Sequence, residues 1–250
     1  MSRVLPILFN TDMVRAILDG RKTMTRRIVR YKYSNTEMKM RTDKYGTRLI
    51  EIQKDVEGET YGKNEDGSTW RKLLPYIEKN PPYRKDDILY VRETWAFQCC
   101  INCMNIYEDE SCMIGKTSTI HEDKDAISEG CYIYHADHLH PEKVIWCPSI
   151  HMPKDAARIW LKVKDVKVER LQDMTLDDFL TEGVCLNPEA FNDPENAYGQ
   201  AKHIFTETWN STIKKTDQDL YGWDVNPWVW VIEFERCDKP EEEFIEDRIN

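Results

Sequence analysis

The chain has 250 residues, 40% of them hydrophobic, so it is long enough to bury the core of one large domain. Its formal net charge of -10 argues against a protein that coats nucleic acid through bulk electrostatics, because phosphate attraction needs a basic surface. No apolar run approaches the roughly 20 residues that cross a bilayer, and no export signal is visible, so we expect a soluble cytoplasmic protein with mostly reduced cysteines.

The first predicted elements are a strand over residues 4–9 and a short helix whose apolar positions recur every three to four residues up to Leu18. Asn10 or Thr11 is suited to cap this helix, and Gly20 ends it. A helix of about two turns is marginal alone, so we expect it to pack on a sheet. The polar, glycine-containing residues 33–82 that follow predict an inserted excursion with weak hairpins.

The core pattern resumes with a buried strand over residues 88–95, and a second excursion over 97–130 leads to a strand over 131–135. A short helix is predicted over 152–157, with Pro153 in its first turn. The next apolar alternation, over 159–168, changes parity near Lys164 and Asp165, which indicates a β-bulge.

Two helices and a last strand complete the predicted core. Thr175 and Asp178 have the spacing of a capping box at the start of a helix over residues 171–184, which Gly183 ends. A second helix is predicted over 197–213, and a strand apolar on both faces over 228–234. The pattern predicts one α+β domain over 1–236, with insertions at 33–82 and 97–130 and an acidic, mobile tail at 237–250.

Four segments resemble those of ASCH domains, which belong to the PUA-like superfamily. The sequence GRKTMTRR, from Gly20 to Arg27, matches the Gly-x-Lys-Thr-x-Thr-x-Arg signature that opens these domains. The segments DILYVRETW (87–95), WCPSIHMP (146–153) and NPWVWVIEF (226–234) look like those of uncharacterised phage members. The resemblance covers most of the predicted core but neither insertion, and it implies a small mixed β-barrel in a host cytoplasm.

The resemblance also implies a cleft that binds a nucleotide, a modified nucleoside or short single-stranded RNA. Some small bacterial members hydrolyse the acetyl amide of N4-acetylcytidine, with a Lys and a Thr in the opening motif and a Glu in a later helix. Those positions correspond here to Lys22, Thr25 and Glu182, the last through a looser alignment. The resemblance thus implies a catalytic trio.

The chemistry of this trio depends on the pKa of the lysine. A Thr hydroxyl needs an adjacent base to become a nucleophile, and Lys22 is a base only if burial or neighbouring cations lower its pKa. Glu182 would orient the amine but would also favour its charged form. Because Lys22 and Thr25 are an odd number of residues apart, a shared site requires a turn or bulge rather than an unbroken strand.

Further residues are candidates for ligand binding, each with a structural alternative. The arginines among residues 21–32 are suited to bind phosphate. The alternative is that they form ion pairs with the excess of acidic residues on the surface. Aromatic residues at strand ends are suited to stack on a base, or fill the core. The candidates are Arg21, Arg26, Arg27, Arg92, Glu93, Trp95, Trp146 and His151. Arg92 and Glu93 have the further alternative of pairing with each other.

The cysteines pose a separate question of metal binding. Cys100 and Cys103 have the spacing of a first zinc ligand pair, and Cys112 and Cys131 would complete a structural zinc site, with free thiols as the alternative. The trio itself requires no cofactor. For the whole chain, we weigh amide hydrolysis or ligand binding in the cleft against a non-catalytic phage accessory protein whose insertions bind a host or virion protein.

Overall fold

The computed structural model describes residues 2–34, 36–44, 46–53, 60–63, 69–72, 77–99, 120–121, 130–138, 142 and 144–240. Only the backbone is described for residues 53, 60–63, 69–72, 98–99, 120–121 and 130–131. Most of the predicted acidic tail therefore lies outside the described residues. Within them, every helix is too short or too polar to cross a membrane.

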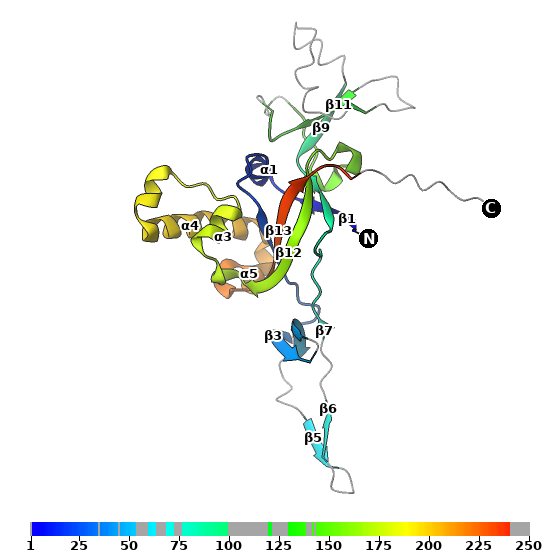
Figure 1. Cartoon of the computed structure of the whole chain (residues 1–250), viewed down its shortest axis with the longest axis vertical. Coiled ribbons are helices and arrows are strands. Elements are labelled where there is room, and N and C mark those ends of the chain that lie inside the picture. Colours follow the sequence, from blue (N-terminus) through cyan, green and yellow to red (C-terminus); the bar gives the residue numbers. More distant parts are fainter. Residues whose placement is uncertain are drawn as a thin grey trace, which may run out of the picture.

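A mixed five-stranded sheet forms the centre of the molecule (Figure 1), in the order β1-β8-β12-β13-β2. Its strands are β1 (Val4–Leu8), β2 (Met24–Ile28), β8 (Ile88–Arg92), β12 (Trp160–Arg170) and β13 (Trp228–Cys237). Strands β1 and β8 are parallel, and the other neighbours are antiparallel. The predicted α+β class is confirmed, whereas the described strands form no closed barrel, since β1 and β2 are the edges of this sheet.

The two longest strands, β12 and β13, curve together across the sheet (Figure 1). Their register shifts between Val163 and Asp165, which confirms the bulge predicted near Lys164 and Asp165. A bulge bends a strand and increases its local twist, because one extra residue is left without a partner in the ladder. The bulge therefore accounts for the curvature of β12 and β13.

Three of the described α-helices begin at side chains that accept backbone N–H groups. Asn10 caps α1 (Thr11–Leu18) by accepting from Met13, and Thr175 and Asp178 form both bonds of the predicted capping box of α3 (Leu176–Thr181). The long helix predicted near the C-terminal end is α4 (Pro194–Thr212), followed by α5 (Gln218–Tyr221). Each cap satisfies N–H groups that lack partners within the helix itself.

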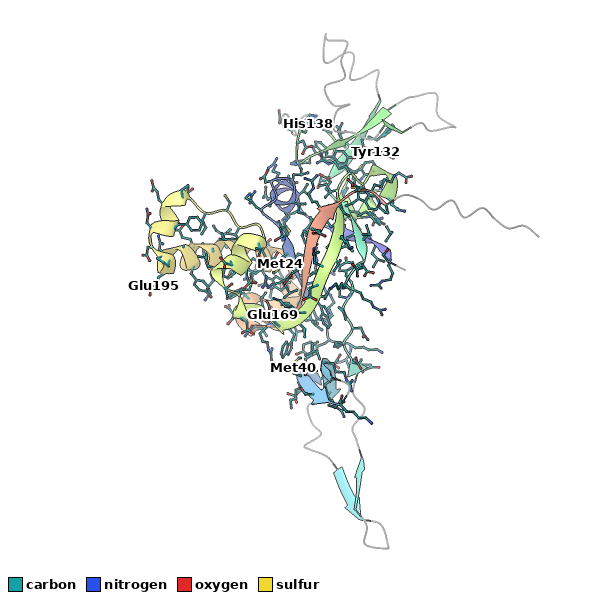
Figure 2. All side chains as sticks on the ribbon, viewed as in Figure 1. Met24, Met40, Tyr132, His138, Glu169 and Glu195 are labelled. Atoms are coloured by element: carbon teal, nitrogen blue, oxygen red, sulfur yellow. The ribbon has the colours of Figure 1, made fainter. Side chains whose placement is uncertain are left out.

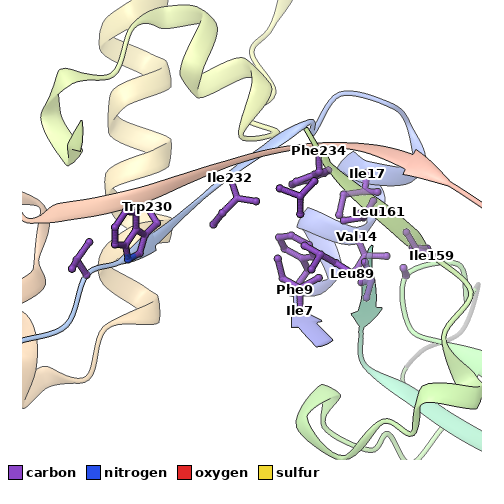
Figure 3. Packing of buried hydrophobic residues seen from close by; sticks show 14 of the residues in the cluster. Ile7, Phe9, Val14, Ile17, Leu89, Ile159, Leu161, Trp230, Ile232 and Phe234 are labelled. Atoms are coloured by element: carbon purple, nitrogen blue, oxygen red, sulfur yellow. The ribbon is translucent and has the colours of Figure 1, made fainter. Parts of the chain in front are cut away.

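The core lies on both faces of the sheet, because successive residues of β13 point in opposite directions. Trp230, Ile232 and Phe234 face a cluster with Phe9 and residues of α1 (Figure 3). Val229 and Val231 instead join a second cluster with α3, α4 and α5. The strand is therefore buried on both sides, as its apolar sequence predicted.

The two predicted insertions form separate small sheets at opposite ends of the molecule (Figure 1). The first contains β3 (Thr36–Asp43), β4 (Gly46–Gln53) and β7 (Ile77–Glu78), with the hairpin of β5 (Thr60–Lys63) and β6 (Thr69–Lys72) beyond. The second contains β9 (Trp95–Cys99), β10 (Ile120–His121) and β11 (Gly130–Tyr134). The central sheet takes none of its five strands from these segments.

Three predicted elements differ from the structure. The helix predicted over 171–184 extends only from Leu176 to Thr181 and is preceded by a 3-10 turn at Leu171–Asp173. The strand predicted over 88–95 is divided, since β8 ends at Arg92 and β9 begins at Trp95, and Glu93 between them pairs with Arg158. The helix predicted over 152–157 is replaced by 3-10 turns at Ser149–His151 and Lys154–Ala156. Met152 is extended between the turns, because a residue that precedes proline avoids the helical region.

Candidate functional site

Lys22 lies between the end of α1 and the start of β2. Gly20 turns the chain with a φ of 76°, and the backbone N–H groups of Arg21 and Lys22 then donate to the carbonyl of Ala16. Strand β2 begins only at Met24, so Lys22 and Thr25 do not share an unbroken strand. A shared site for Lys22 and Thr25 requires that they do not lie on one unbroken strand, and the structure meets this requirement.

The amine of Lys22 is fully buried and surrounded by oxygen atoms. Nζ donates to the carbonyl of Met24 at 2.8 Å, to the carbonyl of Glu182 at 2.7 Å and to Oε2 of Glu182 at 2.5 Å. It also lies 5.5 Å from the ring centroid of Phe9. A buried ammonium requires such partners, since an unpaired charge is very unfavourable inside a protein.

Burial lowers the pKa of Lys22 below its ordinary value. The carboxylate of Glu182 acts in the opposite direction, while the positive charges of Arg27 and Arg26 add to the effect of burial. The sequence predicted opposing effects on this amine without ranking them. In the folded protein desolvation exceeds the attraction of Glu182, so the neutral amine is more accessible than in an exposed lysine.

Glu182 is the C-cap residue of α3, is 6% exposed, and binds two cations. Lys22 contacts Oε2, and Arg26 approaches Oε1 with Nη1 at 3.5 Å. The next residue, Gly183, has a φ of 98°, and a Cβ there would lie 2.9 Å from Cβ of Ala16 and 3.3 Å from Cβ of Lys22. Only glycine fits this turn without strain, so it allows α3 to approach Lys22 closely.

Arg26 lies at the centre of a group of carboxylates. Its Nη2 binds Oε1 of Glu169 at 2.7 Å and Oδ1 of Asp178 at 2.9 Å, in addition to its contact with Glu182. Burial acts to lower the pKa of Arg26, but the carboxylates outweigh it and the pKa is raised. Figure 2 labels Met24 and Glu169 in this region, beside α3.

Thr25 and Arg27 point to the opposite face of β2 from Arg26. Thr25 is 2% exposed and lies opposite Ile232, which belongs to the cluster that contains Phe9. Arg27 lies over the ring of Phe9, 5.2 Å from its centroid, as Lys22 does at 5.5 Å. The predicted Lys22 and Thr25 therefore lie on the Phe9 side of β2, and no described residue hydrogen-bonds to the Thr25 hydroxyl.

Two cavities flank the ion pair between Arg26 and Glu182. The first has a volume of about 380 Å³ and is lined by Glu182 together with Arg21 and Cys185 and with residues of α1 and α4. The second has a volume of about 390 Å³ and is lined by Arg26, Arg27 and Arg30 together with Tyr83 and Trp209. Arg26 and Glu182 are in contact, so each cavity is lined by one member of the same buried ion pair.

The remaining predicted ligand residues fall into two groups. Arg21 lines the first cavity and donates to the carbonyl of Gly183, and Arg27 lines the second. Arg92, Glu93, Trp95, Trp146 and His151 line neither cavity. They lie instead toward the second small sheet.

The proposed pairing of Arg92 with Glu93 is wrong. Glu93 binds Arg158 at 2.9 Å, whereas Arg92 donates to the carbonyl of Ile150 and lies over the ring of Tyr90. Neighbours on a strand point to opposite faces, so an ion pair between them is disfavoured. Burial raises the pKa of Glu93 although Arg158 opposes this effect.

The predicted zinc ligands are not tested by the described residues. Cys100, Cys103 and Cys112 lie outside them, and only the backbone of Cys131 is described. In the described part of the chain, no group of three or more His, Cys, Asp or Glu side chains has the arrangement of a metal site. Cys147, Cys185 and Cys237 are free thiols.

Sequence reasoning missed two members of the Arg26 cluster. Asp178 was interpreted only as a helix cap, and Glu169 was not singled out. A signal for Asp178 was present, because Asp178 in the first turn of α3 and Glu182 at its C-cap are four residues apart and lie on one face. For Glu169 the sequence contains no comparable signal, since it meets Arg26 only through the pairing of β12 and β2 with β13.

The fold and the cluster define a mixed α+β protein with a buried lysine, arginine and carboxylate site. Comparison of the chain with protein families, curated proteins and solved structures found no match in any of the three.

Proposed function

We propose that this protein is an amide hydrolase of the ASCH type that acts on an acylated cytidine or a related modified nucleoside. The observation that carries the proposal is the buried contact of 2.5 Å between Lys22 and Glu182. Glu182 also lines a cavity of about 380 Å³, which Lys22 and Thr25 do not line. The lowered pKa of Lys22 supports its role as a base. The opening motif, the turn before β2 and the curved sheet agree with a PUA-like architecture.

In this mechanism Thr25 is the nucleophile. Its Oγ bonds to the acyl carbonyl carbon, and its proton passes to the neutral amine of Lys22, which keeps one N–H group for Oε2 of Glu182 and one for a neighbouring carbonyl. The bond from that carbon to the exocyclic nitrogen then breaks, and the nitrogen takes the proton from Lys22. Water hydrolyses the resulting threonine ester to release the acid and restore the hydroxyl.

Glu182 and Arg26 act together as positioning residues for the amine. The carboxylate of Glu182 fixes Lys22 through Oε2, and Arg26 binds the other oxygen of the same carboxylate. Glu169 and Asp178 in turn fix Arg26. A base held in place from both sides loses little entropy when the substrate binds.

The test is release of acetate from N4-acetylcytidine by the purified protein and by the variants Lys22→Met and Thr25→Val. Both substitutions approximately conserve volume, so the buried site stays filled while the reacting atom is removed. We expect each variant to lose activity by about 100-fold or more. Thr42→Val, on the exposed side of β3, is the matched control and should retain activity.

Two results would contradict the proposal. A folded wild-type protein that releases no acetate from N4-acetylcytidine or from other N4-acylcytidines is not such a hydrolase. Activity that survives both Lys22→Met and Thr25→Val would place the chemistry elsewhere. Either result would favour the alternative of a non-catalytic protein that acts by binding a partner.

A further inference from the structure

The second cavity has features that the hydrolysis of a nucleoside does not use. It has a volume of about 390 Å³ and its wall includes Arg26, Arg27 and Arg30. Arg26 is neutralised by Glu169, Asp178 and Glu182, so it contributes little free positive charge. The charges that remain for a ligand are those of Arg27 and Arg30.

Arg27 is a partly buried cation without a carboxylate partner among the described residues. Its Nη2 donates to the carbonyl of Leu8 at 2.8 Å, and its guanidinium lies over Phe9. Burial acts to lower the pKa of Arg27 below its ordinary value. A desolvated guanidinium with free N–H groups beside a cavity is suited to bind an anion.

Arg30 adds a second positive charge at the opening of this cavity. Its side chain is 68% exposed, lies over the ring of Tyr221 and is 3.8 Å from Oδ2 of Asp217. That long contact in solvent neutralises it only weakly. Arg30 is therefore free to turn toward a ligand held by Arg27.

The free edge of β2 supplies backbone donors to the same cavity. Val29 donates to the carbonyl of Trp228 on β13. Because pairing alternates along an antiparallel ladder, the N–H groups of Arg26 and Ile28 point the other way, toward the open edge. Both residues line the cavity. Unpaired N–H groups beside arginine side chains match the acceptor oxygens of a phosphate.

We propose that this cavity is a phosphate subsite and that the natural ligand carries a phosphate attached to the nucleoside. The inference rests on the proposed function. Glu182 lines the first cavity and contacts Arg26, which lines the second, so both cavities border one ion pair. In the proposal the modified base occupies the first cavity, and the phosphate is held by Arg27 and Arg30. The preferred substrate class is then an acylated cytidine nucleotide.

The test compares cytidine 5′-monophosphate, cytidine, a short single-stranded cytidine oligonucleotide and inorganic phosphate by titration calorimetry. We expect the monophosphate to bind at least about tenfold more tightly than cytidine, as an arginine contact to a charged group predicts. Arg27→Gln should remove this preference, so that the monophosphate and cytidine bind about equally. Arg27→Lys should retain part of it, and Arg236→Gln on β13, an exposed position with the same charge change, should retain all of it.

The outcomes separate this inference from the proposed function. Equal binding of cytidine and its monophosphate by the wild type, or a preference that survives in both Arg27→Gln and the double variant with Arg30→Gln, would overturn the subsite. Phosphate binding that depends on Arg27 without any acetate release would retain the subsite and reject the hydrolase. Tighter binding of the oligonucleotide than of the monophosphate would identify the phosphate as part of an RNA strand.

Discussion

At the scale of single residues, the site depends on how a few charges are buried. Lys22 is 1% exposed and Glu182 is 6% exposed, so their contact lies in a medium where charges interact more strongly than in water. A buried ion pair offsets its own desolvation only when further hydrogen bonds complete it. Here the carbonyls of Met24 and Glu182 complete it for the amine.

The lowered pKa of Lys22 makes the stability of the protein depend on alkaline pH. Between the pKa of the folded state and the unfolded value of 10.5, the unfolded chain binds more protons at this position. The contribution of Lys22 to the free energy of unfolding therefore rises as the pH rises through that window. Each unit of lowering corresponds to about 1.4 kcal/mol.

This pH dependence is measured by urea unfolding of the wild type and of Lys22→Met at several pH values up to 10.5. We expect the free energy of unfolding of the wild type to increase relative to the variant as the pH rises. For the exposed control variant Lys214→Met, the free energy of unfolding should change with pH in parallel with that of the wild type. A constant difference between the wild type and Lys22→Met would show that Lys22 titrates at its ordinary value.

At the scale of secondary-structure elements, the site depends on how closely α3 approaches the turn after α1. Gly183 makes this approach possible, since it has a φ of 98° and has no side chain at the contact with Ala16 and Lys22. The bond from the N–H of Thr23 to the carbonyl of Thr181 ties the two segments together at 2.9 Å. The position of Glu182 is thus set by a turn.

We expect Gly183→Ala to destabilise the protein by about 2 to 4 kcal/mol, because the new methyl group meets Ala16 at a positive φ. The matched control is Gly199→Ala in α4, where a Cβ meets nothing within 4 Å. That change should stabilise the helix by about 0.5 to 1 kcal/mol. Thermal unfolding measures both, and equal effects of the two variants would contradict the close packing at Gly183.

At the scale of the whole molecule, the small sheet of β3, β4 and β7 is joined to the central sheet. Met38 and Leu49 enter the main core cluster, and Glu51 accepts from the backbone N–H groups of Lys32 and Tyr33. Glu51 also binds Lys79 and Thr36. Burial alone would raise the pKa of Glu51, but these partners lower it to about 2.

We expect Glu51→Gln to destabilise the protein by about 1.5 to 3 kcal/mol at neutral pH, because it removes a charged acceptor from several donors. The pKa of Glu51 is lowered, so its contribution is complete above the unfolded value of 4.5 and is lost as the pH falls toward about 2. Urea unfolding from pH 7 to pH 2 should show the wild type and the variant converging. Glu37→Gln on β3 is the control, and a pH-independent difference for Glu51→Gln would contradict the assignment.

The sequence by itself determined the elements, because their signals are local. Alternation predicted the strands, including the change of parity at Lys164 and Asp165, and the side chains of Asn10 and Thr175 predicted where helices begin. The resemblance of the opening motif also suggested Lys22 and Thr25 as candidate site residues, and a looser alignment in the later helix suggested Glu182. The restriction that Pro153 places on Met152 was overlooked, so the turns around Pro153 were mistaken for a helix.

Only the tertiary structure decided what these residues can do. Lys22 meets Glu182 across 160 positions, and Arg26 meets Glu169 across 143, so neither contact leaves a local pattern. The balance between desolvation and attraction at Lys22 depends on the burial that these contacts create. The same holds for Arg27, because only the folded position of β2 at the edge of the sheet shows that no described carboxylate pairs with it.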